Sequence, residues 1–168
     1  MIKEILLVLL PSVFLILVLL LLFKNYLNQQ FEFAKVKSQQ EIIYPLKLQA
    51  YERLTLFLER IKPQNLLLRV DYENISSQEF YSQLLTEISS ELNHNIAQQI
   101  YIYPATWDAI ILSVNNLKLE LNRILSENKF SNSAKESARF ILQNQDSKSL
   151  ETIDATLLLM KSDIQNIF

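Results

Sequence analysis

The chain has 168 residues and not one of them is glycine. Glycine supplies the positive-φ positions of tight β-hairpins and of many helix C-caps, so a β-rich domain is difficult to build without it. The glycine-rich loops that hold phosphate groups in nucleotide-binding proteins are also missing. The composition therefore predicts an all-α fold, and it excludes the glycine-dependent nucleotide-binding and catalytic motifs.

Residues Ile5 to Phe23 form an uncharged run in which seventeen of nineteen side chains are Leu, Ile, Val or Phe. As a helix this run would cover roughly 28 Å, close to the ~30 Å thickness of a bilayer's hydrocarbon core. Pro11 and Ser12 interrupt the run, but membrane helices tolerate proline. A cleaved signal peptide is the main alternative, although its apolar region is usually shorter and no small-residue cleavage site follows here. We predict a transmembrane helix that anchors the chain in a lipid bilayer.

The charges beside this run indicate an orientation. Lys3 precedes it, whereas Lys24, Lys35 and Lys37 follow it. Because lysines accumulate on the cytoplasmic side of membrane spans, we expect a single-pass protein whose C-terminal domain is cytoplasmic. The chain has no cysteine, so disulfide bonds give no information about the compartment.

The sequence divides into three predicted parts: a transmembrane anchor over residues 1–24, a polar, Gln-rich helical stalk or linker over residues 25–43, and a soluble α-helical domain over residues 44–168. Prolines fit the first turn of a helix, so Pro45 and Pro104 each predict the start of one, and Pro63 predicts a break. We predict an N-terminal transmembrane helix followed by a small antiparallel bundle of four or five helices.

Several helix ends carry recognisable signals. Ser76 to Glu79 and Ser133 to Glu136 are typical of capping boxes, and Asp146 or Ser147 is expected to cap the last helix. The helix after Ser76 is expected to end near Gln99. Ile100 to Tyr103 alternates like a strand but has no partner strand, which favours an extended connector.

Charge is unevenly distributed along the soluble part. Residues 44–69 hold five basic and two acidic groups, residues 70–117 hold six acidic groups and no Lys or Arg, and residues 118–148 hold six basic and four acidic groups. Either these regions pack together and their charges cancel, or the acidic region faces a basic partner. No basic patch with interleaved aromatic residues occurs, so we expect no binding to nucleic acid.

One stretch, Glu91 to Gln99, invites a chemical interpretation. On a helix Glu91, His94 or Asn95, and Gln98 share one face, with Gln99 beside them. The Glu-x-x-His spacing is used by di-iron helical bundles, but these need two such motifs, and this chain has a single histidine. A single copy therefore cannot form that site, although a symmetric dimer could. We expect a polar network with loop backbone, or a contact with a ligand or partner.

A second polar cluster lies on the helix expected after Pro45. It comprises Tyr51, Glu52, Arg53, Glu59 and Arg60, for which we expect ion pairs with other helices. Trp107 is expected to anchor the core. Without cysteine or paired histidines the chain lacks a thiol nucleophile and the usual zinc ligands. We therefore expect no enzyme activity, no metal and no cofactor.

Two stretches carry a family resemblance. The segments from Pro45 to Arg60 (PLKLQAYERL…FLER) and from His94 to Trp107 (HN…QQIY…W), together with the leading apolar run, resemble a family of uncharacterised membrane-anchored proteins of Bacteroidota. The resemblance implies a one-span anchor, a helical body and a Gram-negative inner membrane. It implies no activity and no site residue.

The leading hypothesis from these features is a protein-interaction, scaffold or assembly module at the inner membrane, with unidentified protein partners. The alternative is a membrane-tethered ligand-binding or sensory domain whose pocket includes the Glu91–Gln99 edge. The sequence leaves self-association into a homo-oligomer open.

Overall fold

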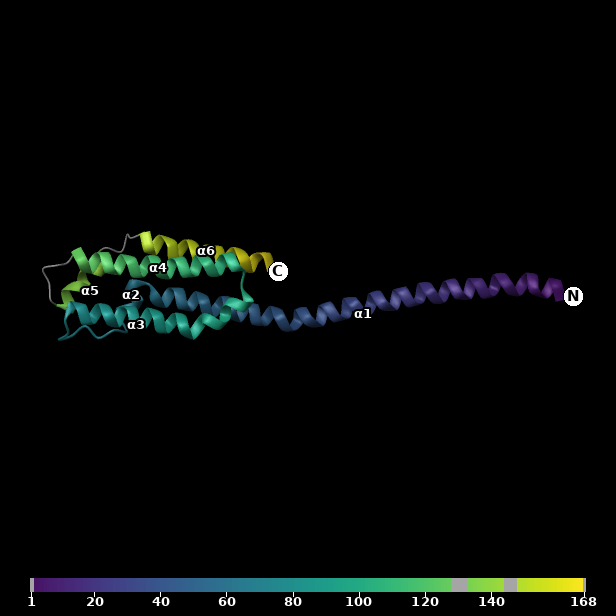
Figure 1. The fold of residues 1–168 in the computed structure, drawn as a ribbon, viewed down its shortest axis with the longest axis horizontal. Coiled ribbons are helices and arrows are strands. Elements are labelled where there is room, and N and C mark those ends of the chain that lie inside the picture. Colours follow the sequence, from purple (N-terminus) through teal and green to yellow (C-terminus); the bar gives the residue numbers. More distant parts are fainter. Residues whose placement is uncertain (1, 128–132, 144–147, 168) are drawn as a thin grey trace. The chain divides into compact units, whose positions relative to one another are not determined.

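A computed structural model describes residues 2–127, 133–143 and 148–167. Within these ranges the side chains of residues 2–13, 16, 32–34, 36, 38, 39, 125, 127 and 167 are not described. The elements are α1 (Ile2–Ile61), α2 (Pro63–Leu66), α3 (Ser77–Asn95), the 3-10 helix η1 (Ile96–Tyr101), α4 (Pro104–Glu127), α5 (Ala134–Gln143) and α6 (Lys148–Ile167) (Figure 1). Among the described residues there is no strand, only an isolated bridge between Ser76 and Ser133. The predicted all-α fold is confirmed.

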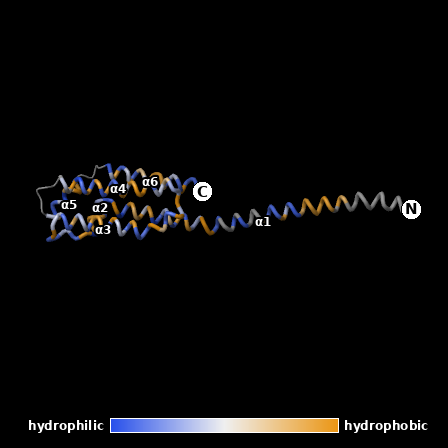
Figure 2. The backbone as a smooth tube through the Cα atoms, in the orientation of Figure 1, coloured by the Kyte–Doolittle hydropathy of each residue, from blue (hydrophilic) through white to orange (hydrophobic). Residues whose placement is uncertain are grey.

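The chain divides into two compact units, residues 1–45 and residues 46–168. The first unit is entirely helical in the part described, and its apolar side chains at positions 14, 15 and 17–23 are exposed, for example Phe14 at 68% and Phe23 at 59%. Figure 2 shows the hydrophobic colour of this segment giving way to polar residues further along α1. Of the predicted span Ile5 to Phe23, the side chains of residues 5–13 and 16 lie outside the described residues. Within what is described, no helix combines the length and apolarity needed to cross a membrane.

The prediction that Pro45 starts a new helix is wrong. Helix α1 continues through Pro45 without interruption. A proline inside a helix removes one backbone hydrogen bond, here the one that the carbonyl of Glu41 would accept. Glu41 is exposed, so water can satisfy this carbonyl. Pro45 nevertheless lies at the boundary between the two compact units.

The core of residues 46–168 forms around the last four turns of α1. Its buried stripe, fully inaccessible to solvent, comprises Ala50, Tyr51, Leu54, Phe57, Leu58 and Ile61. Phe80, Leu84 and Ile88 of α3 and Ile110, Val114, Leu117 and Leu121 of α4 belong to the same cluster. Both helices contribute residues at helical spacing, as their apolar stripes predict.

Among the described residues, helices α4 and α6 share the most extensive backbone contact of any two elements. Small residues explain it: Ser113 is fully buried between them and contacts the Thr156 hydroxyl at 2.9 Å. Ser113 also donates to the carbonyls of Ala109 and Thr152. Since these hydroxyl groups are hydrogen-bonded, their burial carries little desolvation penalty.

The start of α3 was predicted correctly and its end was not. Ser76 caps the helix, because its hydroxyl accepts a hydrogen bond from the backbone N–H of Glu79 at 3.1 Å. In the preceding loop Asn74 adopts a positive φ of 59°, a conformation that asparagine tolerates better than most residues and that this glycine-free chain must reach without glycine. The helix ends at Asn95, and Ile100 and Tyr101 belong to η1 instead of an extended connector. The predicted caps Asp146 and Ser147 lie outside the described residues.

Candidate functional site

A hollow of about 340 Å³ lies between the second part of α1 and the end of α3. It brings together members of both polar clusters that the sequence singled out. The lining residues are Arg53, Leu56, Phe57 and Arg60 from α1 and Glu91, His94 and Asn95 from α3. We call this feature the α1–α3 hollow.

Glu91 is the electrostatic centre of the α1–α3 hollow. Its carboxylate oxygen Oε1 forms ion pairs with Arg60 Nη2 at 2.9 Å and with Arg69 Nη1 at 2.5 Å. The Glu91 side chain is only 13% exposed. Arg69 also donates to the backbone carbonyl of Arg60 at 2.8 Å, which fixes the guanidinium group of Arg69. Two arginines therefore share one carboxylate, and no second carboxylate among the described residues pairs with them.

The other polar residues of α3 make local hydrogen bonds. Nδ1 of His94 donates to the carbonyl of Ser90 at 2.8 Å, because a carbonyl can only accept. Asn95 is buried and donates to the carbonyl of Glu91 at 2.9 Å. These bonds within α3 hold the His94 and Asn95 side chains along the hollow's wall.

Arg53 is the charged residue of the hollow that has no partner among the residues described. It is exposed, and within the described part of the chain it makes no ion pair or hydrogen bond. Arg53, Leu56 and Arg60 follow one another at i, i+3 and i+7, which places them on one face of α1.

The structure does not gather the remaining predicted site residues in the hollow. Gln98 and Gln99 lie in η1, the first half-buried and the second exposed. Trp107 is half-buried and packs against the core. Glu52 is exposed and has no ion pair with any residue that the structure describes.

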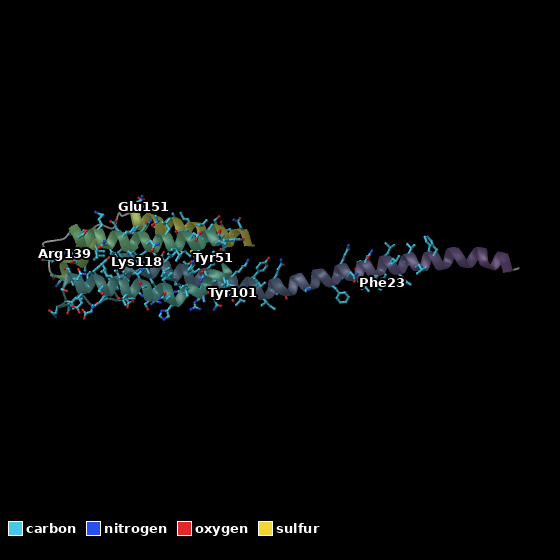
Figure 3. The ribbon with its side chains drawn as sticks, viewed as in Figure 1. Phe23, Tyr51, Tyr101, Lys118, Arg139 and Glu151 are labelled. Atoms are coloured by element: carbon cyan, nitrogen blue, oxygen red, sulfur yellow. The ribbon has the colours of Figure 1, made fainter. Side chains whose placement is uncertain are left out.

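Tyr51 takes part in a different network, which links α1 to α4 and α6. Its hydroxyl donates to Asp163 Oδ2 at 3.0 Å, and the hydroxyl of Thr106 donates to the same oxygen. Figure 3 shows Tyr51 within the bundle. Burial raises the pKa of the Tyr51 hydroxyl well above its ordinary value, and its donation to the Asp163 carboxylate raises it further.

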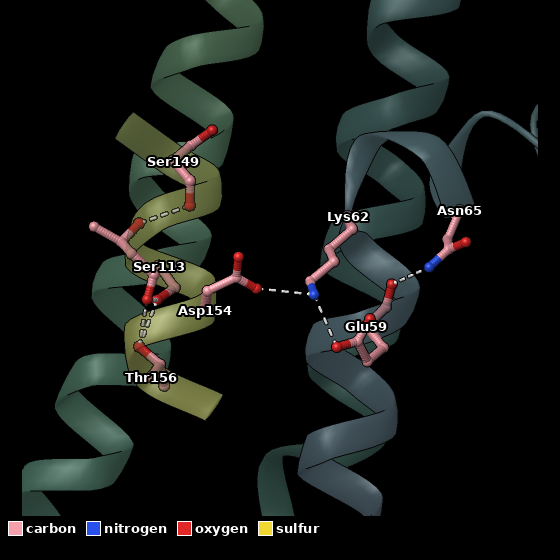
Figure 4. Close-up of polar contacts among 8 residues, drawn as sticks. Glu59, Lys62, Asn65, Ser113, Ser149, Asp154 and Thr156 are labelled. Carbon is pink, nitrogen blue, oxygen red and sulfur yellow. Dashed lines mark hydrogen bonds and ion pairs between the residues drawn. The ribbon is translucent and has the colours of Figure 1, made fainter. Parts of the chain in front are cut away.

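Glu59 joins a third contact at the end of α1. Lys62 Nζ lies between Glu59 Oε1 at 2.8 Å and Asp154 Oδ1 of α6 at 2.9 Å (Figure 4). Burial lowers the pKa of Lys62, but the two carboxylates together outweigh burial, so the pKa is raised. This contact connects the end of α1 to α6.

Five residues of these networks were missed from the sequence: Lys62, Arg69, Thr106, Asp154 and Asp163. Arg69 is the only charge in the apolar run from Leu66 to Val70, and Asp163 follows the buried Met160 by three residues, so it borders the inward face of α6. Both positions carried a usable signal. Nothing in the sequence distinguishes Asp154 from an ordinary acidic residue at a solvent-facing position of a helix.

Comparison with known proteins gives a family but no activity. Residues 1–167 match a family of unknown function (DUF7935). The chain belongs to this family. No curated protein and no solved structure matches the DUF7935 chain. Among the described residues, no group of three or more His, Asp or Glu side chains could hold a metal ion.

Proposed function

We propose that this DUF7935 protein is a single-pass inner-membrane protein whose helical domain binds another protein, as a scaffold or assembly module. The observation that carries the interaction role is the α1–α3 hollow, which is open to solvent and has more positive than negative charge. An open, charged surface of this kind favours recognition of a complementary macromolecular surface.

The anchor in this proposal is the segment from Ile5 to Phe23. Its described side chains, residues 14, 15 and 17–23, are apolar and exposed on every side of the helix. A helix that is apolar all round requires an apolar environment, either a protein core or a bilayer. The lysines at positions 24, 35 and 37 favour a cytoplasmic domain. The Gram-negative setting, in Bacteroidota, rests on the family resemblance of the sequence.

A ligand-binding or sensory role is the second candidate. The volume of the α1–α3 hollow falls within the range of roughly 300–1,000 Å³ that small-molecule sites occupy. Its walls combine the apolar Leu56 and Phe57 with convergent polar groups. The proposal assigns the chain no catalytic reaction and no cofactor.

The test is cross-linking in native membranes, followed by purification of the full chain through a C-terminal tag and mass spectrometry. We expect one protein partner in near-stoichiometric yield, reproducibly and at native expression level. Recovery of the tagged chain alone would contradict a stable hetero-complex. In that case the cross-linked mass would identify a homo-oligomer, and a monomer would favour the ligand-binding role.

A further inference from the structure

We propose that the α1–α3 hollow binds an acidic amphipathic helix of a partner protein, one that carries two carboxylates seven residues apart with an apolar residue between them. This inference rests on the proposed function, since it specifies the partner of the same site. It begins from the surface stripe Arg53, Leu56 and Arg60 on α1.

The spacing of the stripe defines the partner. Arg53 and Arg60 are seven residues apart, which is about 10.5 Å along a helix axis. A partner helix that lies along α1 presents its own side chains at the same intervals, so glutamates at i and i+7 would meet both arginines. Grooves that receive helices are generally read in this way, through anchors at i, i+3 or i+4, and i+7.

The charge of the hollow favours an anion as its ligand. Arg53 has no partner within the described residues, and Glu91 compensates only one of the two arginines that bind it. The carboxylate of Glu91 is held by Arg60 and Arg69, so it is not free to neutralise Arg53. Arg60 itself stays 56% exposed on its side chain, which leaves guanidinium donors available for a carboxylate.

An apolar contact distinguishes a helix from a small anion. Leu56 lies between the two arginines on the stripe and is 56% exposed, although the next residue, Phe57, is fully buried. A free dicarboxylate would leave Leu56 in water. A leucine on the partner, between its two glutamates, would cover Leu56 and gain roughly 25 cal/mol for each Å² of apolar surface removed from solvent.

The experiment uses the full chain in neutral detergent micelles and a fluorescein-labelled, alanine-based helical peptide of about 20 residues. The aligned peptide has two glutamates seven residues apart and a leucine between them. The control peptide has the same composition, but its glutamates are five residues apart and therefore point to different faces. Fluorescence anisotropy at low salt measures both dissociation constants.

We expect the aligned peptide to bind about tenfold more tightly than the control peptide. Arg53→Gln should weaken aligned binding about five- to tenfold, because a charge-assisted hydrogen bond is lost. Arg139→Gln is the matched control: this exposed arginine lies on α5, at the end of the bundle away from Tyr51 (Figure 3), and its removal should leave binding unchanged. Leu56→Gln should also weaken binding, at high salt as well as low.

The inference would be overturned by no binding of the aligned peptide up to 1 mM, by equal binding of both peptides, or by equal effects of the two arginine substitutions. Displacement of the peptide by millimolar citrate or phosphate with the same sensitivity to Arg53→Gln would overturn it in favour of a small-anion site. Recovery of the same cross-linked partner with Arg53→Gln would show that only the site assignment is wrong, whereas recovery of no partner from the unsubstituted chain contradicts the proposed function itself.

Discussion

Two parts of the same helix, α1, use apolar residues in opposite ways. Residues 14–23 are apolar without exception, and the side chains described there are all exposed. Residues 46–61 alternate apolar and polar groups with helical period, and six apolar side chains from Ala50 to Ile61 are completely buried. Both segments are helical and rich in leucine, so secondary structure does not distinguish them.

The difference is in how polar residues are distributed around the helix. An apolar stripe with charges opposite it can be covered by neighbouring helices, and α3, α4 and α6 cover the stripe of residues 46–61. Neighbouring helices on one side cannot cover a helix that is apolar on every face. It needs an environment that is apolar in every direction, and the bilayer proposed for residues 5–23 provides it.

The largest expected effect comes from charge in the first segment. Leu15→Arg combined with Val18→Arg should oppose membrane insertion by about 5–7 kcal/mol, since each arginine costs roughly 2.5–3.5 kcal/mol near the centre of a span. Fractionation of cells should then find the protein outside the membrane pellet. The same two charges at exposed positions of the second segment, Gln49→Arg with Glu52→Arg, should leave it in the pellet.

Matched phenylalanine substitutions compare the two segments directly. Phe57→Ala should lower the free energy of unfolding by about 3–5 kcal/mol, because it opens a cavity in the core. Phe23→Ala should leave that free energy unchanged, since Phe23 is exposed and lies outside the compact unit 46–168. Urea unfolding of both variants in detergent measures the contrast, and equal losses would show that the two segments fold as one unit.

Alkaline pH should destabilise the second segment through Tyr51. Its folded-state pKa is raised by burial and by Asp163, so the neutral hydroxyl stabilises the fold below the ordinary pKa of about 10, and this contribution is lost as pH rises above it. Tyr51→Phe should cost about 0.5–1.5 kcal/mol at pH 7 through the lost hydrogen bond. The unfolding free energy of the Tyr51→Phe variant should then fall less steeply than that of the unsubstituted chain between about pH 10 and 12. The pKa of Lys62 is also raised, so its contribution to stability is lost at alkaline pH in both proteins. Parallel curves of unfolding free energy against pH would contradict the role assigned to Tyr51.

The smallest expected effect concerns a helix that covers the second segment. Ser76→Ala removes the N-cap of α3 and should lower the free energy of unfolding by about 1 kcal/mol. Ser82→Ala, at an exposed position inside the same helix, is the control and should be neutral or slightly stabilising. Thermal unfolding of both variants would show whether the cap contributes; equal melting temperatures would show that it does not.

Local signals allowed much of the bundle to be predicted. The apolar stripe from Ala50 to Ile61 and the cap at Ser76 depend on residues within a few positions, and both agree with the structure. The prediction from Pro45 was wrong because losing one backbone hydrogen bond costs little free energy where water can replace it. The end of α3 misled because Ile100 to Tyr103 alternates over a length too short to separate a strand from a 3-10 turn.

The α1–α3 hollow could be predicted only in its parts. Arg53, Arg60, Glu91, His94 and Asn95 were each singled out, but as two separate clusters. Their proximity depends on the packing of α1 against α3, which no local pattern encodes. Arg69 enters from the connection between these helices, and its direction follows from the fold of that connection.

Alkaline carbonate extraction of membranes from cells with the full, unsubstituted chain tests the central claim most directly. An integral span resists extraction, because its contact with lipid does not depend on ionic interactions. We expect the protein to stay in the membrane pellet and to be released only by detergent. Release into the carbonate supernatant would contradict the anchor, and with it the assignment of this helical module to the membrane.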